Sequence, residues 1–302
     1  MKLKTILLLV GGVLLVAALV LAALLIPVRT AGEPQALSVQ TAEADKPEQE
    51  GAPVEENTTV ETTTEQTTTE QTTTEQSVST ITFPAADGLI ITADYYPAAD
   101  ATAPFIILFH QANYSRGEYL EIAPKLVALG YNCLAVDQRS GGATNGVKNE
   151  TFLAAKAQKL ATGYTDAYAD LEAALSYVVS TYAPTKLLVW GSSYSSSLVL
   201  ILASEHPDEI AAVLSFSPGE YFKLDDKQIA DYAKNITQPV FITSAKSEEK
   251  AWRGIADQIT SAGSVFFVPQ ANGRHGSSTL YEKTPNHAEY WTAVEAFLAS
   301  LQ

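Results

Sequence analysis

Cysteine and basic residues are scarce in this sequence. Its 302 residues include one cysteine, and 19 Lys or Arg stand against 34 Asp or Glu, which gives a formal net charge of −15. A single cysteine excludes an intrachain disulfide. Cys133 lies in the apolar run Tyr-Asn-Cys-Leu-Ala-Val, which predicts a buried small hydrophobic residue and not a reactive thiol. The negative charge repels nucleic acid and anionic lipid surfaces, so neither is expected as a partner.

The negative charge is also unevenly distributed. Residues 31–76 contain eleven Asp or Glu and one Lys, so 11 − 1 = 10 of the 15 net negative charges lie there. The rest of the chain is only mildly acidic, as an ordinary soluble domain is. Histidine is scarce as well, with four in the whole chain, so few residues are candidates for a catalytic base.

Residues 1–29 have the pattern of a transmembrane signal anchor. Lys2 and Lys4 precede 21 consecutive apolar or glycine residues, 6–26. As a helix this run reaches about 30 Å, the thickness of the hydrocarbon core. A cleaved signal usually has a shorter apolar region, so we expect an uncleaved single-pass anchor, with the remainder of the chain outside the cell membrane. The small residues 30–32 leave cleavage and secretion as the alternative. No cysteine follows the run, which excludes a lipid-modified lipoprotein.

Residues 30–78 predict a disordered linker rich in Thr and Glu. The pentad Thr-Thr-Thr-Glu-Gln occurs three times over residues 62–76. The segment has almost no apolar side chains to bury and carries like charges, so it should stay extended. The sequence leaves open whether these threonines carry O-linked sugars.

Residues 79–302 alternate between strand-like and helix-like segments. The segments 79–83 and 89–96 flank a Pro-Ala-Ala-Asp-Gly turn and predict an antiparallel hairpin. Such alternation predicts an α/β domain with a mostly parallel, doubly wound sheet covered on both faces. In sheets of this kind the ligand site lies beyond the carboxyl ends of the strands. Further strands are expected at 105–109, 131–136, 186–190, 210–215, 240–243 and 265–268, and helices at 119–129, 166–182, 194–204, 249–262 and 289–301.

A nucleophile-elbow pattern follows the strand at 186–190. Residues 191–195, Gly-Ser-Ser-Tyr-Ser, match Gly-x-Ser-x-Gly except that Ser195 replaces the last glycine. The turn needs small residues two positions before and after the nucleophile, because strand and helix approach closely there. Serine should fit at some steric cost. With a buried strand before the motif and an apolar helix after it, Ser193 is the expected nucleophile.

On these residues the chain resembles the α/β-hydrolase superfamily, most closely its compact serine esterase and dienelactone-hydrolase-like branch, over about residues 79–302. The resemblance implies that a loop after the third strand supplies an oxyanion-hole amide. Residues 109–113, Phe-His-Gln-Ala-Asn, occupy that position. The backbone amides of Gln111 and Tyr194 are therefore expected to hold the negative charge of a tetrahedral intermediate.

The same resemblance implies where the catalytic acid and base lie. Residues 239–248, Pro-Val-Phe-Ile-Thr-Ser-Ala-Lys-Ser-Glu, match the acid strand of the family and place Glu248 at the acid. Ala245 replaces a family glycine, so a slip of register would make Glu249 the acid instead. The base is expected in a Gly-x-His-Gly loop, and residues 273–276, Gly-Arg-His-Gly, provide His275. The order Ser, acid, His agrees with the family.

Other segments are expected to support the site. Residues 137–142, Asp-Gln-Arg-Ser-Gly-Gly, are close to the family pattern Asp-x-Arg-Gly-x-Gly and predict a structural loop anchored by its charged pair. The Tyr- and Asp-rich stretch 217–236 is a candidate short lid, too small for a full cap domain. The candidate substrate-pocket residues are His110, Tyr114, Tyr221 and Trp252.

Together these expectations describe a membrane-tethered serine hydrolase that cleaves small-molecule carboxylic esters through an acyl-enzyme on Ser193. His275 would take the proton of the serine and Glu248 would orient the imidazole, so no metal or organic cofactor is expected. An amidase, peptidase or acyltransferase of the same fold would use the same residues. A catalytically inactive surface binding module is the alternative from another class, supported by Ser195 and Ala245. No oligomeric state is predicted.

Overall fold

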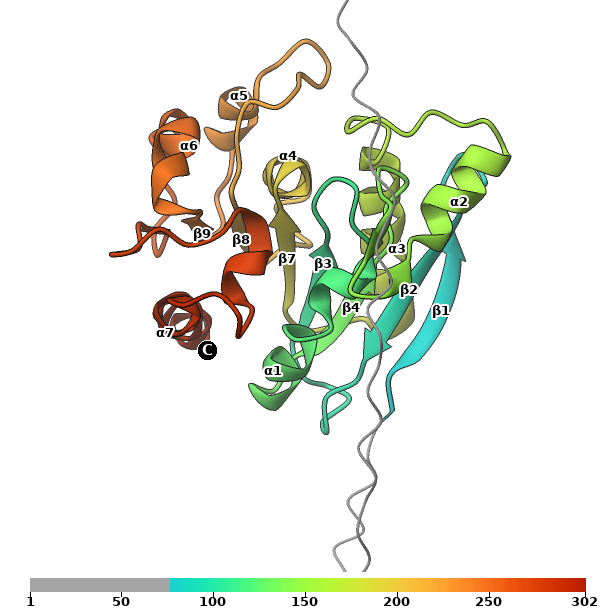
Figure 1. Ribbon diagram of the computed structural model, residues 1–302, viewed down its shortest axis with the longest axis horizontal. Helices are drawn as coiled ribbons and strands as arrows, with labels where there is room; N and C mark the ends of the chain where they lie inside the picture. Colours follow the sequence, from blue (N-terminus) through green and yellow to red (C-terminus); the bar gives the residue numbers. More distant parts are fainter. Residues whose placement is uncertain (1–76) are drawn as a thin grey trace, which may run out of the picture. The chain divides into compact units, whose positions relative to one another are not determined.

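The computed structural model of this protein describes residues 77–302 (Figure 1). The predicted signal anchor at 1–29 and nearly all of the predicted linker at 30–78 lie outside these residues. Within the described part of the chain, no helix combines the length and the apolar character needed to cross a membrane.

An eight-stranded sheet with the strand order β1-β2-β4-β3-β7-β8-β9-β10 forms the centre of the described region. β1 (Ser79–Pro84) and β2 (Ile90–Tyr96) form the predicted antiparallel hairpin, and β2 also pairs antiparallel with β4. All other neighbours in this sheet pair in parallel. The prediction of a mostly parallel α/β sheet with an N-terminal hairpin is therefore confirmed.

The other strands of this sheet lie close to their predicted positions. They are β3 (Phe105–Phe109), β4 (Asn132–Val136), β7 (Leu187–Ser192), β8 (Ala212–Phe216), β9 (Val240–Thr243) and β10 (Val265–Phe267). Every residue of β3, β4, β7, β8 and β9 is buried, as expected of parallel strands covered on both faces. Cys133 in β4 is fully buried, as its apolar context predicts.

Helices cover both faces of the sheet (Figure 1). One hydrophobic core joins the sheet to α1 (Ala123–Ala128) and α7 (His287–Ser300). The second core joins the opposite face to the remaining helices, which are α2 (Glu150–Ala157), α3 (Tyr168–Tyr182), α4 (Tyr194–Glu205), α5 (Ile229–Ala233) and α6 (Glu249–Ala256). Successive residues of β3 alternate between the two cores, as the strand pleat requires.

Two predicted helices are shorter in the structure. The helix expected at 119–129 is replaced by a 3₁₀ turn, η1 (Arg116–Tyr119), followed by α1. Pro124 explains the break, because it lacks an amide hydrogen and is tolerated only in the first turn of a helix. The helix expected at 249–262 ends at Ala256.

Several short elements carry too little periodicity to be predicted. They are β5 (Ala143–Thr144), β6 (Val147–Lys148), η2 (Lys246–Glu248), η3 (Gly276–Leu280), α2 and α5. α2 begins at a local signal, because the Asn149 side chain accepts a hydrogen bond from the Phe152 amide. The candidate lid at 217–236 contains only α5 and an isolated bridge between Leu224 and Lys227. The segment is therefore a short loop with one short helix, and it does not form a cap domain.

Candidate active site

Ser193 lies at the sharp turn between β7 and α4. Its backbone has φ 58° and ψ −123°, a combination that residues other than glycine rarely adopt. Gly191 lies so close to the first turn of α4 that an added Cβ would be 2.3 Å from the carbonyl oxygen of Ser195. Only glycine fits at position 191, and the close approach of strand and helix therefore depends on it.

The Ser195 hydroxyl fills the space that a glycine would leave empty. Its Oγ accepts a hydrogen bond from the Ser192 amide at 2.9 Å and lies 2.8 Å and 2.9 Å from the carbonyl oxygens of Phe109 and His110. Ser195 is fully buried. The substitution thus fits the elbow, and it adds a polar link between the elbow and the end of β3.

Ser193, His275 and Glu248 are joined by hydrogen bonds across three loops. His275 Nε2 lies 2.7 Å from Ser193 Oγ, and His275 Nδ1 lies 2.7 Å from Glu248 Oε1. Because a carboxylate only accepts, Nδ1 carries the hydrogen and Nε2 is free to accept from the serine. This arrangement can move a proton from Ser193 to the imidazole.

The sheet brings these three residues together. Ser193 follows β7, Glu248 follows β9, and His275 follows β10. These strands belong to the parallel part of the sheet, so their carboxyl ends share one edge. Residues separated by as many as 82 positions in the sequence thereby come within hydrogen-bond distance.

The structure distinguishes between the two candidate acids. Glu248 contacts His275, whereas the neighbouring Glu249 forms an ion pair with Arg253 on α6. Partial burial acts to raise the pKa of Glu248, but hydrogen bonds from His275 and Ser217 outweigh it and hold that pKa below its ordinary value. Glu248 is therefore ionised at neutral pH and faces the ring that it would stabilise.

Ser217, at the end of β8, is a site residue that the sequence analysis missed. Its Oγ donates to Glu248 Oε2 at 2.7 Å and accepts from the Gly276 amide at 2.8 Å. Its backbone φ of 60° lies in the left-handed region. A small polar residue directly after a buried parallel strand was the available signal, but it does not reveal which partner the hydroxyl meets.

The structure contradicts the assignment of Gln111 to the oxyanion hole. The Gln111 amide already donates to Glu118 Oε2 at 2.7 Å, so it cannot serve a developing oxyanion. The amides of Ala112 and Tyr194 have no acceptor among residues 77–302. Tyr194 begins α4, where helix amides are free of internal partners. The amides of Ala112 and Tyr194 are therefore among those left free after β3 and after the nucleophile.

Two of the candidate pocket residues are structural instead. His110 is fully buried, its Nδ1 bonds to the Gln111 carbonyl, and its Nε2 accepts from the Gln138 amide. Burial lowers the pKa of His110 to about 4, so the ring stays neutral. Trp252 is fully buried and donates to Ser244 Oγ. Neither side chain is available to a substrate, and both assignments are wrong.

Tyr221 bonds to Ser217 beside the triad, whereas Tyr114 bonds to the loop at 137–142. The Tyr221 hydroxyl donates to the Ser217 carbonyl at 2.7 Å. Burial raises the pKa of Tyr221 to about 12, and the Glu248 charge contributes in the same direction. Tyr114 is half-buried in the loop after β3, where its carbonyl accepts the Gly142 amide.

An aromatic surface adjoins the elbow. The rings of Tyr164 and Tyr194 stack with centroids 4.6 Å apart, and Phe222 meets Tyr164 edge-on at 6.4 Å. Tyr164 and Tyr221 are each about 40% exposed (39% and 41%), so solvent reaches both rings. A flat or apolar group could pack here next to Ser193.

Ion pairs hold the loops under the site. Asp137 pairs with Arg116 at 2.7 Å, and Arg139 pairs with Asp170 at 2.7 Å and Asp87 at 2.6 Å. The loop at 137–142 is therefore structural, as predicted. Its two charged residues have different partners, so the expected pair between them does not form.

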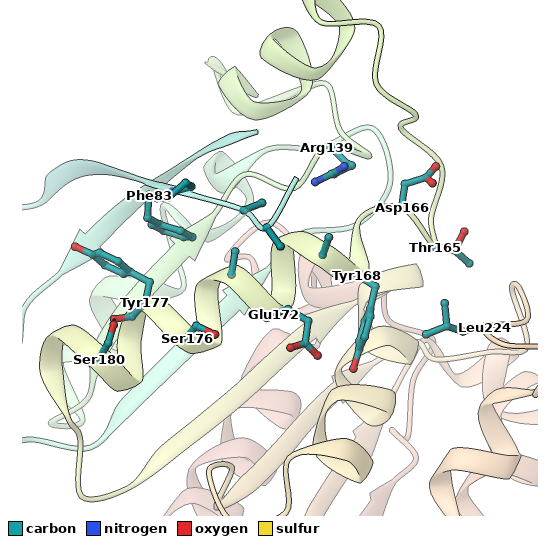
Figure 2. Close-up of a pocket in the computed structure, with 15 residues that line it drawn as sticks. Phe83, Arg139, Thr165, Asp166, Tyr168, Glu172, Ser176, Tyr177, Ser180 and Leu224 are labelled. Carbon is teal, nitrogen blue, oxygen red and sulfur yellow. The ribbon is translucent and has the colours of Figure 1, made fainter. Parts of the chain in front are cut away.

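A groove of about 1040 Å³ lies along α3, away from the triad. Figure 2 shows the rings of Phe83, Tyr168 and Tyr177 and the carboxylates of Asp166 and Glu172 around it. No member of the hydrogen-bonded triad lines this groove. Within residues 77–302 there is also no group of three or more His, Cys, Asp or Glu side chains suited to a metal ion.

Comparison with known proteins gives one family and a consistent fold. A family model described as serine aminopeptidase, S33, matches residues 100–263. No curated protein matches the chain.

The esterase Pf2001 of Pyrococcus furiosus is 18% identical with a TM-score of 0.58, over 74% of this chain and 92% of that one. Est1E of Butyrivibrio proteoclasticus, solved with bound ferulic acid, is 14% identical with a TM-score of 0.57, over 73% of this chain and 98% of that one. A dienelactone hydrolase of Anabaena variabilis is 14% identical with a TM-score of 0.56, over 74% of this chain and 96% of that one.

Proposed function

Because this chain belongs to the serine aminopeptidase S33 family of hydrolases, we propose that it is a serine hydrolase that cleaves carboxylic esters through an acyl-enzyme on Ser193. The observation that carries the proposal is the pair of 2.7 Å hydrogen bonds that link Ser193 to His275 and His275 to Glu248. The fold shared with solved esterases supports it.

The first step is attack on the ester carbonyl. His275 Nε2 takes the proton of Ser193 as the oxygen forms a bond to the carbonyl carbon, and Glu248 stabilises the resulting imidazolium. Negative charge develops on the former carbonyl oxygen. The amides of Ala112 and Tyr194 are the donors that we assign to this oxyanion, each worth roughly 3 kcal/mol of transition-state stabilisation.

The second step completes acylation: His275 gives its proton to the alcohol oxygen as the bond between that oxygen and the carbonyl carbon breaks, which leaves the acyl group on Ser193. In the deacylation that follows, His275 takes a proton from a water molecule that attacks the acyl carbon and then returns it to Ser193. The serine ester breaks, the carboxylic acid leaves, and the serine recovers its hydrogen. This cycle uses only residues of the chain and water.

A fluorophosphonate probe tests the proposal directly. We expect the native chain to be labelled and to hydrolyse p-nitrophenyl esters, and Ser193→Ala to do neither. A Ser193→Ala variant that is labelled as strongly as the native chain would remove the serine mechanism. A native chain that is folded yet neither labelled nor active would favour the inactive binding module. An acyltransferase would turn over faster when alcohols are added.

An aminopeptidase is the second candidate, because the matching family model carries that description. Such an enzyme must bind the substrate ammonium with a carboxylate near the serine. Glu220, within the candidate lid, instead accepts hydrogen bonds from the amides of Ile229 and Ala230. Because Glu220 is already bonded to these two amides, an ester is favoured over an aminopeptidase substrate. Aminoacyl p-nitroanilides and p-nitrophenyl esters, compared on the same preparation, distinguish the two.

We also propose that the hydrolase is tethered to the outer face of the membrane by residues 1–29, and this rests on the sequence alone. The expected result is that activity sediments with membranes and is released by protease added to intact cells. Activity in the culture medium, on a chain lacking these residues, would favour a cleaved signal instead.

A further inference from the structure

Glu118 is a buried carboxylate whose hydrogen bonds reach the loops around Ser193. It belongs to η1 and is fully buried. Its Oε2 accepts the Gln111 amide at 2.7 Å, and its Oε1 accepts the Ser192 hydroxyl at 2.8 Å. Among the described residues Glu118 takes part in no ion pair. A carboxylate without a cation is costly to bury, so its contacts at this place call for an explanation.

Glu118 connects three loops that must be aligned for catalysis. It contacts the loop after β3 through Gln111 and the elbow through Ser192. The same Ser192 Oγ accepts the Ser277 amide at 2.9 Å, which continues the chain of bonds into the loop of His275. Gly276 lies so close that an added Cβ would be 2.4 Å from Ser192 Oγ. Nucleophile, base and oxyanion loop therefore meet around one carboxylate.

The contact with Gln111 determines the direction of the next peptide. Once the Gln111 amide is held by Glu118, the backbone is oriented at that point, and the amide of Ala112 is left without an acceptor among residues 77–302. An oxyanion hole requires amides that have no other acceptor, and the Ala112 amide meets that requirement. Without the carboxylate, the Gln111 amide could turn toward the oxyanion site and displace Ala112.

We propose that Glu118 is a positioning residue for the hydrolysis: it holds the Gln111 amide so that Ala112 serves the oxyanion, and through Ser192 it keeps that amide aligned with Ser193 and His275. The inference rests on the proposed function. Glu118 does not touch the substrate, and its effect is exerted through the loops that it joins.

Three variants of the full chain test the role. Glu118→Ala removes both acceptors, so the Ala112 amide is no longer held in place. We expect kcat to fall about 100-fold with KM changed less than about twofold, because that amide acts in the transition state. Glu118→Gln keeps one oxygen for the Gln111 backbone amide and places its NH₂ where Oε1 now accepts from Ser192 Oγ and, at 3.3 Å, from Gln111 Nε2. It should therefore restore kcat only to within about 10-fold of the native chain. Asp170→Asn changes another buried carboxylate, one that pairs with Arg139, and should lower thermal stability with little change in kcat per folded molecule.

The pH profile provides a readout that a merely structural role would not alter. Burial raises the pKa of Glu118 to about 7, against hydrogen bonds from Gln111 and Ser192. The groups that face it are His275 and the hydroxyls of Tyr119, Tyr194 and Tyr281, and burial keeps these three hydroxyls neutral by raising their pKa.

Below about pH 7 the carboxyl is protonated and resembles the amide of glutamine, whereas above it both oxygens accept. The ratio of native kcat to Glu118→Gln kcat should therefore lie near 1 at pH 5.5 and rise to about 10 at pH 8.5. His275 is present in both chains, so the ratio reports the effect of the group at position 118.

The outcomes separate this inference from the proposed function. With p-nitrophenyl butyrate as substrate, an inactive Ser193→Ala and a pH-dependent ratio support both. An inactive Ser193→Ala together with Glu118 variants that only lose thermal stability, at unchanged kcat and a constant ratio, overturns the positioning role alone. A Ser193→Ala variant that retains activity overturns the proposed function and this inference with it.

Discussion

At the scale of single residues, the hydroxyl of Ser217 joins two loops that the triad requires. It donates to Glu248 and accepts from the amide of Gly276, which follows the proposed base His275. It also helps to hold the pKa of Glu248 below its ordinary value, after the hydrogen bond from His275. One buried hydroxyl thus influences both the position and the charge of the proposed acid.

Replacing Ser217 by alanine should lower kcat/KM about 10-fold, or about 1.4 kcal/mol. The ionised form of Glu248 loses a donor, so its pKa rises and the loss of activity on the acid side moves to higher pH. Steady-state kinetics from pH 4.5 to 8 measures both effects. The matched control is Ser215→Ala, which removes a hydroxyl bonded to the Ser196 carbonyl and not to the triad. Equal profiles for the two variants would contradict the role of Ser217.

At the scale of elements, the approach of β7 to α4 determines whether the nucleophile can form its turn. Gly191 has no space for a Cβ, and the hydroxyl of Ser195 bonds to the end of β3. The elbow is therefore a junction of two strands and one helix. Its geometry depends on small side chains and also on a specific polar contact.

Gly191→Ala should cost at least about 3 kcal/mol of unfolding free energy, because a Cβ at 2.3 Å from a backbone oxygen forces strand and helix apart. Labelling by fluorophosphonate should be lost with it. Gly254→Ala in α6 is the control, since an added Cβ there meets nothing within 4 Å and should raise stability by up to about 1 kcal/mol. Chemical denaturation measures both. A Gly191→Ala chain with native stability would show that the elbow adapts.

At the scale of the whole molecule, the three residues of the triad and both proposed oxyanion amides lie between Ala112 and His275, inside the described region. We therefore assign the proposed chemistry to residues 77–302, whereas tethering by residues 1–29 is a proposal from the sequence.

Removal of residues 1–76 should leave kcat and KM for a soluble p-nitrophenyl ester within about twofold of the full chain, because no group that acts in the transition state is lost. The measurement compares the two chains in the same detergent buffer. A large rise in KM on truncation would mean that the N-terminal segment takes part in substrate binding. Unchanged kinetics together with loss of membrane association would support separate roles.

Much of the fold and part of the site could be predicted from the sequence, because the signals are local. Buried strands appear as apolar runs, and the elbow appears as small residues between a strand and a helix. Resemblance to a family extended these signals to His275 and Glu248. Helix ends were less well predicted where Pro124 intervened, and α2 has an uneven apolar pattern.

The sequence by itself determined the α/β sheet and the elbow at Ser193, and resemblance to a family added His275 and left Glu248 and Glu249 as candidate acids. Each of these depends on residues adjacent in the chain or on a motif at a known strand end. The contact with His275 that favours Glu248 came only from the tertiary structure. Only the tertiary structure decided which amides remain free, that His110 and Trp252 are buried, and that Ser217 and Glu118 join the loops. These contacts cross between strands far apart in the sequence, at distances set by packing. A hydrogen bond needs donor and acceptor within about 3 Å, and no pattern along a single chain specifies that separation.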